Sequence, residues 1–304
     1  MTTVDRPIRQ PVFLDLPPEQ ANPQTAGVVV LPAPFERTST YGRGSARGPA
    51  AIIAASQEVE LFDAVLGCEP YEAAGGIATL APLDVTDCDG QAVAERLRHE
   101  VGKWLIKNRL LITLGGEHTS VVGAIRAHCE AYPNVTVLQL DAHSDLRPEY
   151  NGDPWNHACA MARVLDFHDH LVQVGIRSQA KAERATAQER GLTVVHAHDI
   201  HRKDDERADW IEEIIEATHH NVYVTFDCDV MDPSLVPATG APEPGGLTWR
   251  QVNALLRRLC LERNVVGLDV NELAPIEGMQ FPEFTMAKLI YRFVGYRCPC
   301  RHRF

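Results

Sequence analysis

The sequence predicts an α/β protein in which a doubly wound, mainly parallel sheet carries helices on both faces. Short runs rich in Val, Ile and Leu recur along the chain, and they lack the polar alternation of strands with one solvated face. Stretches with the period of an amphipathic helix separate these runs, as they do in a sheet built from strand–helix–strand units. Both observations favour strands that are buried on both faces.

Six apolar runs are long enough to form the strands of this sheet. They occupy residues 26–31, 110–114, 135–140, 171–176, 222–226 and 265–270. In five other stretches, apolar side chains recur three to four positions apart, which places them on one face of a helix. We expect these helices at 92–107, 120–131, 181–190, 210–217 and 248–263.

A glycine-rich segment, residues 38–49, follows the first predicted strand. Pro49 suits the first turn of a further helix, because the backbone N–H that proline lacks has no partner at that position. A phosphate-binding loop would require Gly-Lys-Ser or Gly-Lys-Thr, which this segment lacks. The sequence therefore predicts that a helix begins here, and it assigns no function to the glycine-rich segment.

The composition is that of a globular protein with enough apolar material for one large core. Hydrophobic residues make up 45% and charged residues 23% of the 304 positions. The sequence shows no internal repeat, low-complexity tract or linker-like change of composition. We expect one domain over residues 1–304, with flexible tails at 1–10 and 297–304.

The formal net charge of −12 argues against a nucleic-acid partner, because Lys and Arg are too few and too scattered to neutralise a phosphate backbone. The chain has no run of about 18 apolar residues, which a membrane-spanning helix requires, and no apolar core of a signal peptide. We therefore expect a cytoplasmic protein that binds neither nucleic acid nor membrane. A cationic small-molecule substrate is compatible with the charge.

Ligands of open α/β sheets gather beyond the carboxyl ends of the strands, so polar residues that directly follow the apolar runs are candidate site residues. The run 110–114 ends in Gly115, Gly116, Glu117 and His118. The two glycines allow a tight turn that presents the imidazole at the sheet edge. Taken alone, such a histidine equally fits a structural role.

The run 135–140 is followed by Asp141, His143 and Asp145 at alternate positions. While the segment stays extended, alternate side chains point the same way and form a chelating edge. Carboxylates behind a fully apolar strand need a counter-charge, because they are rarely buried without an ion pair or a metal. A solvated loop is the alternative interpretation.

The run 222–226 ends in Asp227 and Asp229, with Cys228 facing the other way. The three motifs together hold four carboxylates and two imidazoles, which is too much negative charge without cations. Two divalent ions would balance it. Oxygen-rich ligands with some imidazole favour manganese, and iron, cobalt or nickel could take its place. Two such ions bridge and deprotonate a water, so the motifs predict a hydrolase.

These motifs resemble those of the ureohydrolases, the family of arginase and agmatinase. The resemblance extends from about residue 11 to residue 296, and it implies an arginase-like form of the predicted α/β fold. The motifs that carry it are Gly-Gly-Glu-His at 115–118, Asp-Ala-His-Ser-Asp at 141–145 and Phe-Asp-Cys-Asp-Val-Met-Asp-Pro at 226–233.

The resemblance implies two manganese ions in each subunit and assigns their ligands. Asp141 and Asp227 would bridge the two ions. The first ion would be held by His118, Asp141, Asp145 and Asp227, and the second by Asp141, His143, Asp227 and Asp229.

The resemblance also implies three catalytic residues. Asp145 would touch the bridging hydroxide and protonate the departing amine. His157 stands where the family carries a proton-shuttling histidine, a role that suits an imidazole. Glu272 matches the glutamate that pairs with the guanidinium, a planar cation that favours bidentate hydrogen bonds. From the residues alone, a packing role for His157 and a surface salt bridge for Glu272 remain open.

The loop after the second motif resembles the agmatinase branch, because Asp-Leu-Arg at 145–147 replaces the Asn- and Ser-rich loop of arginase. This implies hydrolysis of the guanidino compound agmatine to putrescine and urea. The alternatives are a guanidinobutyrase, a guanidinopropionase, an aminopropylagmatine ureohydrolase or a guanidine hydrolase, which would differ in the pocket for the substrate's tail. Glu149, Trp155 and Glu243 are candidates for that pocket and equally fit exposed positions.

Two other classes of protein compete with this hypothesis. A catalytically silent homologue, kept for oligomerisation, would have lost ligands, and here all six are present. A deacylase on the related fold would have fewer carboxylates and one zinc. The resemblance further implies a homo-oligomer, commonly a trimer or hexamer. Cys298, Cys300 and His302 make an incomplete zinc set, so we expect an ordinary tail there.

Overall fold

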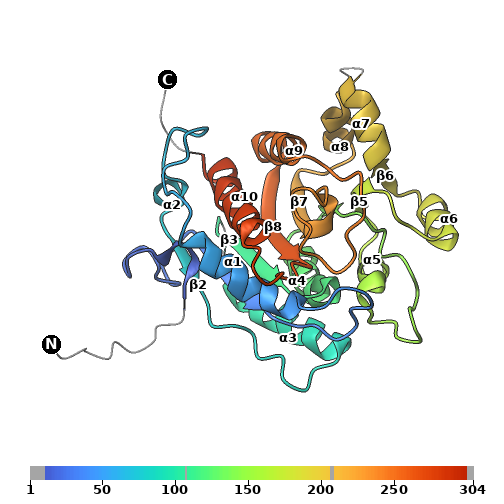
Figure 1. Cartoon of the computed structure of the whole chain (residues 1–304), viewed down its shortest axis with the longest axis horizontal. Helices are drawn as coiled ribbons and strands as arrows, with labels where there is room; N and C mark the ends of the chain where they lie inside the picture. The colour runs from blue at the N-terminus through green and yellow to red at the C-terminus, as the bar shows by residue number, and fades with distance from the viewer. Residues whose placement is uncertain (1–10, 107, 206–208, 300–304) are drawn as a thin grey trace.

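The computed structural model describes residues 11–106, 108–205 and 209–299. Within these residues, eight strands form one sheet in the order β2-β1-β3-β8-β7-β4-β5-β6, and all neighbouring strands are parallel (Figure 1). The predicted parallel α/β fold is thus confirmed. The strands are β1 (Val28–Ala33), β2 (Ile77–Thr79), β3 (Leu110–Gly115), β4 (Val135–Leu140), β5 (Leu171–Ile176), β6 (Thr193–His196), β7 (Asn221–Asp227) and β8 (Asn264–Asn271).

Six of these strands coincide with the predicted runs, apart from shifts of one or two residues at their ends. The sequence analysis missed β2 and β6, which form the two edges of the sheet. Strand β2 has only three residues, and three of the four residues of β6 are only partly buried. A short, half-exposed edge strand does not need a long apolar run, so its sequence signal is weak.

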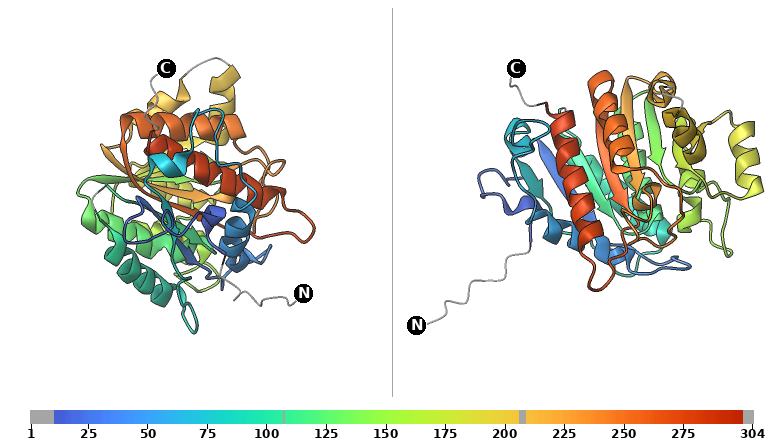
Figure 2. Two further views of the ribbon diagram at one scale, coloured as in Figure 1. Left: turned by 90° about the vertical axis from the view of Figure 1, so that its left-hand side faces the viewer. Right: turned by 45° about the horizontal axis from the view of Figure 1, so that its top comes forward.

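Helices cover both faces of the sheet, and Figure 2 shows the sheet between them. On one face, α1, α9 and α10 pack against one another and against an apolar core that includes Phe226 and Phe293. On the other face, α3, α4 and α5 enclose a second core around Leu97 and Met161. The helices are α1 (Gly48–Ser56), α3 (Gly90–Trp104), α4 (Val122–Ala131), α5 (Ala160–Val164), α9 (Trp249–Glu262) and α10 (Phe281–Arg297).

The remaining helices lie near the sheet edges. They are α2 (Pro70–Ala73), α6 (Lys181–Glu189), α7 (Ala197–Asp205) and α8 (Trp210–Glu216). The five predicted helices correspond to α3, α4, α6, α8 and α9, and Pro49 lies in the first turn of α1 as expected. Helix α10 was not predicted from periodicity. Most of its residues are buried, so its sequence is apolar on several sides and lacks one polar face.

The order of the strands places the site. Strands β3 and β4 follow one another in the chain, but β8 and β7 lie between them in the sheet. The carboxyl ends of β3, β8, β7 and β4 are therefore neighbours at one edge. A crevice beyond such a reversal of strand order is the usual ligand site of an open α/β sheet.

In the part of the chain that the structure describes, no helix is both long and apolar enough to span a membrane. The predicted N-terminal tail, residues 1–10, lies outside the described residues, as do Cys300 and His302. Arg297, the first residue of the predicted C-terminal tail, is the last residue of α10. Its guanidinium donates hydrogen bonds to the carbonyl oxygen of Val265 and to Oδ1 of Asn264.

Candidate metal centre

All of the metal ligands predicted from sequence lie at the carboxyl edge of the four central strands. His118 begins a 3-10 turn after β3, and Asp229 lies in another after β7. Two groups of side chains there bring their ligand atoms within 4.8 Å of one another. The first group is His118, Asp141 and Asp227, and the second is Asp141, His143 and Asp229.

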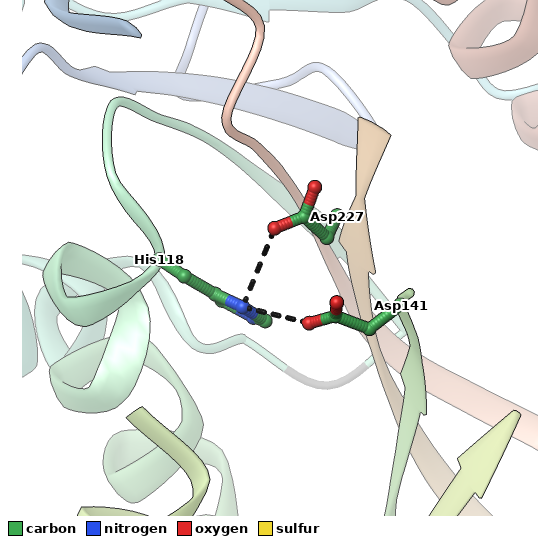
Figure 3. A group of neighbouring side chains, drawn as sticks. All are labelled: His118, Asp141 and Asp227. Carbon is green, nitrogen blue, oxygen red and sulfur yellow. Dashed lines mark ion pairs between the residues drawn. The ribbon is translucent and has the colours of Figure 1, made fainter. Parts of the chain in front are cut away.

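The imidazole of His118 points between aspartates from two strands (Figure 3). Its Nδ1 lies 3.2 Å from Oδ2 of Asp141 and 3.7 Å from Oδ2 of Asp227. The carboxylate of Asp145, which is outside both groups, has Oδ2 at 3.0 Å from the same nitrogen. Nevertheless Nδ1, a buried atom, takes part in no hydrogen bond among the described residues. A lone pair that faces three carboxylates in this way fits a metal ion.

The second group is more open to solvent. Nδ1 of His143 lies 2.9 Å from Oδ2 of Asp229 and 3.7 Å from Oδ1 of Asp141. The side chain of His143 is 28% exposed, whereas that of Asp141 is fully buried. Asp141 belongs to both groups, so its two carboxylate oxygens face the two histidines. Asp227 belongs to the first group only.

Backbone and amide donors also form hydrogen bonds to these carboxylates. The N–H of Ala142 donates to Oδ1 of Asp229 at 2.9 Å, and the N–H of Asp229 donates to Oδ1 of Asp227 at 2.9 Å. Asp141 accepts the N–H of His143 at 2.6 Å and the side-chain amide of Gln139 at 2.7 Å. Each carboxylate is therefore oriented by the strand ends before any cation binds.

The charges of this cluster call for cations. Burial by itself lowers the pKa of His143, but the charge of Asp229 and hydrogen bonds to both partner aspartates raise this pKa to about 12. Burial and the charge of Asp141 raise the pKa of Asp145 to about 7, and burial and Asp229 raise that of Asp227 well above its usual value. The cluster thus retains protons that divalent ions would replace, which again fits a metal site.

A cavity of about 300 Å³ opens above the cluster. His143, Asp145, His157 and Glu272 contribute to its wall, so the structure brings the three predicted catalytic residues together beside the predicted ligands. The volume lies at the lower end of the range of small-molecule pockets.

Glu272 follows β8 directly and is buried, with its backbone in the left-handed region at φ 60°. Its Oε1 accepts the N–H of His118 at 2.7 Å, and its own N–H donates to the carbonyl oxygen of Gly116. Burial and the charge of Glu117 raise the pKa of Glu272 well above its usual value. A non-glycine residue in a left-handed conformation is commonly found at functional sites, where the surroundings compensate for its strain.

The outer wall of the cavity differs from the one expected from sequence. Glu149, Trp155 and Glu243 are not among the residues that line it. Trp155 packs against the core beneath α3, and the carbonyl oxygen of Glu243 accepts hydrogen bonds from Arg177. The outer lining is instead formed by Tyr41, Arg147, Tyr150, Gln179 and Glu183.

Two of these lining residues belong to the loop whose sequence resembles the agmatinase branch, although that resemblance did not show which of its side chains reach the cavity. Arg147 and Tyr150 come directly after the Asp-Ala-His-Ser-Asp motif, and the Arg147 guanidinium lies over the Tyr150 ring at 4.8 Å. Glu183 is buried and accepts the N–H of Leu146 at 3.0 Å, which ties the same loop to α6. Glu183 had no sequence signal, because it lies 38 residues beyond Asp145.

The family model of the arginase family matches residues 26–295. The chain belongs to the arginase family. Among curated relatives of this arginase-family protein, N(1)-aminopropylagmatine ureohydrolase of Thermus thermophilus is 38% identical over 90% of this chain and 91% of its own length. Agmatinase of Pyrococcus horikoshii is 32% identical over 89% and 92%.

Solved structures of arginase-family proteins have the same fold as this chain. The agmatine ureohydrolase of Thermoplasma volcanium superposes with a TM-score of 0.81 and 29% identity over 96% of this chain and 95% of its own. The chain is thus an enzyme of the agmatinase-like branch of the ureohydrolases. The family depends on a binuclear metal centre, and the two ligand groups agree with this.

Proposed function

We propose that this ureohydrolase splits agmatine into urea and putrescine with the help of two manganese ions. The observation that carries the proposal is the unpaired, buried Nδ1 of His118, which faces three aspartates beside a cavity that also holds Glu272. The oxygen-rich ligand set is the reason for manganese as the metal.

In this proposal each ligand group would hold one ion, and Asp141, which belongs to both groups, would serve both ions. Asp145 would complete the first group, and Asp227 of that group would also serve the second ion. When bound, a pair of divalent ions lowers the pKa of a shared water to near neutrality and supplies a hydroxide nucleophile.

The side chains of the cavity bind the substrate and move its protons. The Glu272 carboxylate pairs with the planar guanidinium and orients the carbon for attack, since one hydrogen bond from His118 leaves lone pairs free on both of its oxygens. Attack by the hydroxide forms a C–O bond to the guanidinium carbon. Asp145 then takes the proton of the added hydroxyl group and passes it to the nitrogen of the alkyl amine, whose C–N bond breaks to leave urea and the amine. The imidazole of His157 exchanges protons with solvent at the cavity wall.

A second substrate is favoured by a specific observation. Four relatives that are 32 to 38% identical to this chain carry the name N(1)-aminopropylagmatine ureohydrolase. The reacting guanidino group of that compound is the same as in agmatine, so the same ligands and Glu272 would serve. Only the outer wall around Tyr41, Arg147 and Tyr150 would have to accommodate a longer cationic tail.

We also propose a homo-oligomer, a trimer or hexamer. Exposed apolar side chains occur in close succession between β8 and the first turn of α10, and such a group is typical of a protein–protein interface. They are Ile276, Met279, Phe281 and Phe284, with exposed fractions between 38 and 52%.

The proposal is tested by loading the purified chain with manganese and measuring urea release from agmatine, N(1)-aminopropylagmatine, guanidinobutyrate, arginine and guanidine side by side. We expect turnover of agmatine, two metal ions per chain, and loss of both turnover and one ion in Asp229→Ala. Preferential turnover of another compound would reassign the substrate. Release of no urea from any of them by the metal-loaded chain would refute the proposed reaction.

A further inference from the structure

The glycine-rich segment that follows β1, for which the sequence analysis found no role, contacts both the candidate proton carrier and the turn after β3. Thr38 is the residue that makes these contacts. Its Oγ1 lies 3.0 Å from Nδ1 of His157 and 3.1 Å from Oε1 of Glu117. The backbone N–H of His157 also donates to this hydroxyl, at 2.9 Å.

We infer that Thr38 and Glu117 are positioning residues that hold His157 in the tautomer with its proton on Nδ1, so that Nε2 keeps a lone pair for the cavity. This inference rests on the proposed role of His157 as a proton carrier. Neither Thr38 nor Glu117 is among the ligands and catalytic residues named above. Both would act through His157.

The hydrogen bonds of the Thr38 hydroxyl determine the tautomer. A hydroxyl has one hydrogen to donate and two lone pairs that accept. The N–H of His157 occupies one lone pair, and the hydroxyl donates its own hydrogen to Oε1 of Glu117. One lone pair remains for the contact at 3.0 Å, and Nδ1 must therefore be the donor. A neutral imidazole with Nδ1–H carries its lone pair on Nε2.

Glu117 is well placed to be the fixed acceptor in this series of hydrogen bonds. The residue is fully buried, and its second oxygen, Oε2, accepts the backbone N–H groups of Arg37 at 2.8 Å and Thr38 at 2.6 Å. Three donors thus converge on one carboxylate.

The glycines of the turn after β3 make this approach possible. The N–H of Glu117 donates to the carbonyl oxygen of Phe35 at 2.8 Å. A Cβ on Gly116 would lie only 2.0 Å from that same oxygen, so a side chain there would push the two segments apart. The Gly-Gly-Glu-His motif therefore has two roles. It places His118 at the metal centre, and its Glu117 binds Thr38.

The ring of His157 lines the cavity, and none of the hydrogen bonds among the described residues engages its Nε2. A proton carrier needs this arrangement, because its free nitrogen must face the reacting groups in a fixed direction. Loss of orientation of a general acid or base costs on the order of a hundredfold in rate. We therefore expect the effect of Thr38 to lie in kcat rather than in KM.

The test combines proton positions with kinetics. Neutron diffraction from crystals of the perdeuterated, manganese-loaded protein should show deuterium on Nδ1 and not on Nε2 of His157. In Glu117→Gln, the amide can donate to Thr38, so the deuterium should move to Nε2. Thr38→Val should lower kcat about tenfold to a hundredfold with KM and metal content unchanged, and Thr38→Ser should restore kcat to within a few fold.

Thr25→Val is the control, because Thr25 is an exposed threonine that does not line the cavity and whose hydroxyl donates only to the nearby carbonyl oxygen of Asn22. It should leave kcat and the tautomer unchanged. The inference is overturned if the parent protein carries deuterium on Nε2, if Glu117→Gln does not change the tautomer, or if Thr38→Val keeps the parent kcat. The diffraction result needs no substrate, so failure of urea release would count against the proposed function and not against the tautomer.

Discussion

Nε2 of His118 lies 2.8 Å from the hydroxyl oxygen of Thr225, deep beneath the metal centre. That hydroxyl in turn donates to Oδ1 of Asp269 at 2.8 Å, and Asp269 is fully buried and also accepts the hydroxyl of Tyr223 at 2.7 Å. Because the threonine hydrogen is used by Asp269, Nε2 of His118 must be the donor. The proton is thereby kept on Nε2, and Nδ1 is left with the lone pair that faces the aspartates.

Thr225→Val should weaken metal binding about tenfold to a hundredfold, because it removes the acceptor that fixes the ring of His118. Thr225→Ser keeps the hydroxyl and should bind metal nearly as the parent does. Titration of the metal-free chain with manganese, followed by calorimetry, measures the effect. Thr136→Val is the matched control, since Thr136 is also a buried strand threonine that accepts a backbone N–H, from His219, but lies away from the site. Equal affinities in Thr225→Val and Thr136→Val would contradict this account.

Glu272→Gln should reduce kcat/KM for agmatine about thirtyfold while both metal ions stay bound. The amide oxygen can still accept the N–H of His118, so the turn should be preserved. The loss of kcat/KM then measures the contribution of the negative charge that pairs with the guanidinium. A charged hydrogen bond contributes about 2 kcal/mol, which corresponds to this factor. Steady-state kinetics with metal analysis of the same sample provide the measurement. If the variant also loses metal ions, the role of Glu272 is to stabilise the metal centre and not to bind the substrate.

Asp63→Asn should destabilise the fold by about 2 to 3 kcal/mol at neutral pH. The carboxylate is fully buried and pairs with Arg292 at 2.9 Å and Lys288 at 3.3 Å on α10. Burial raises the pKa of Asp63, but the hydrogen bond from Arg292 and the charges of Arg292 and Lys288 hold it below its usual value. Urea-induced unfolding of parent and variant at several pH values measures the difference.

The sign of the pH dependence follows from that lowered pKa. A carboxyl whose pKa is lower in the folded state stabilises the fold above its unfolded pKa of about 4, and this contribution is lost as the pH falls through the folded value. The difference in free energy of unfolding between the parent and Asp63→Asn should therefore become smaller as the pH falls. Asp84→Asn is the control, because Asp84 and Arg96 form an exposed pair. Asp84→Asn should cause no measurable loss of stability. A difference in free energy of unfolding for Asp63→Asn that grows as the pH falls would contradict the ion-pair account.

Phe281→Glu should shift the protein toward smaller species in light scattering coupled to size-exclusion chromatography. Phe281 is 52% exposed within the apolar group of residues 276–284, and a carboxylate there would have to be desolvated in an interface. Leu261→Glu is the control, because Leu261 is 70% exposed on α9, outside that group. An unchanged mass for Phe281→Glu would place the interface elsewhere on the surface.

The fold could be predicted where burial is complete. The central strands β3, β4, β7 and β8 are covered on both faces, so each is a nearly uninterrupted apolar run with sharp ends. The edge strands β2 and β6 are too short to form an apolar run of this kind. Helix α10 is buried on several sides, so it lacks the polar face that the helical period requires.

The residues of the site could also be predicted, because acidic and imidazole side chains directly after a buried strand are unusual in any other role. The sequence alone therefore determined the six inner strands, the candidate ligands and the family resemblance. The tertiary structure decided which ligands share a group, which nitrogen of each histidine faces the centre, and that Thr38, Glu117, Thr225 and Asp269 support them. These contacts join segments up to 119 residues apart. The direction of a hydrogen bond depends on which atoms lie close together in the folded chain, and a local stretch of sequence does not determine this.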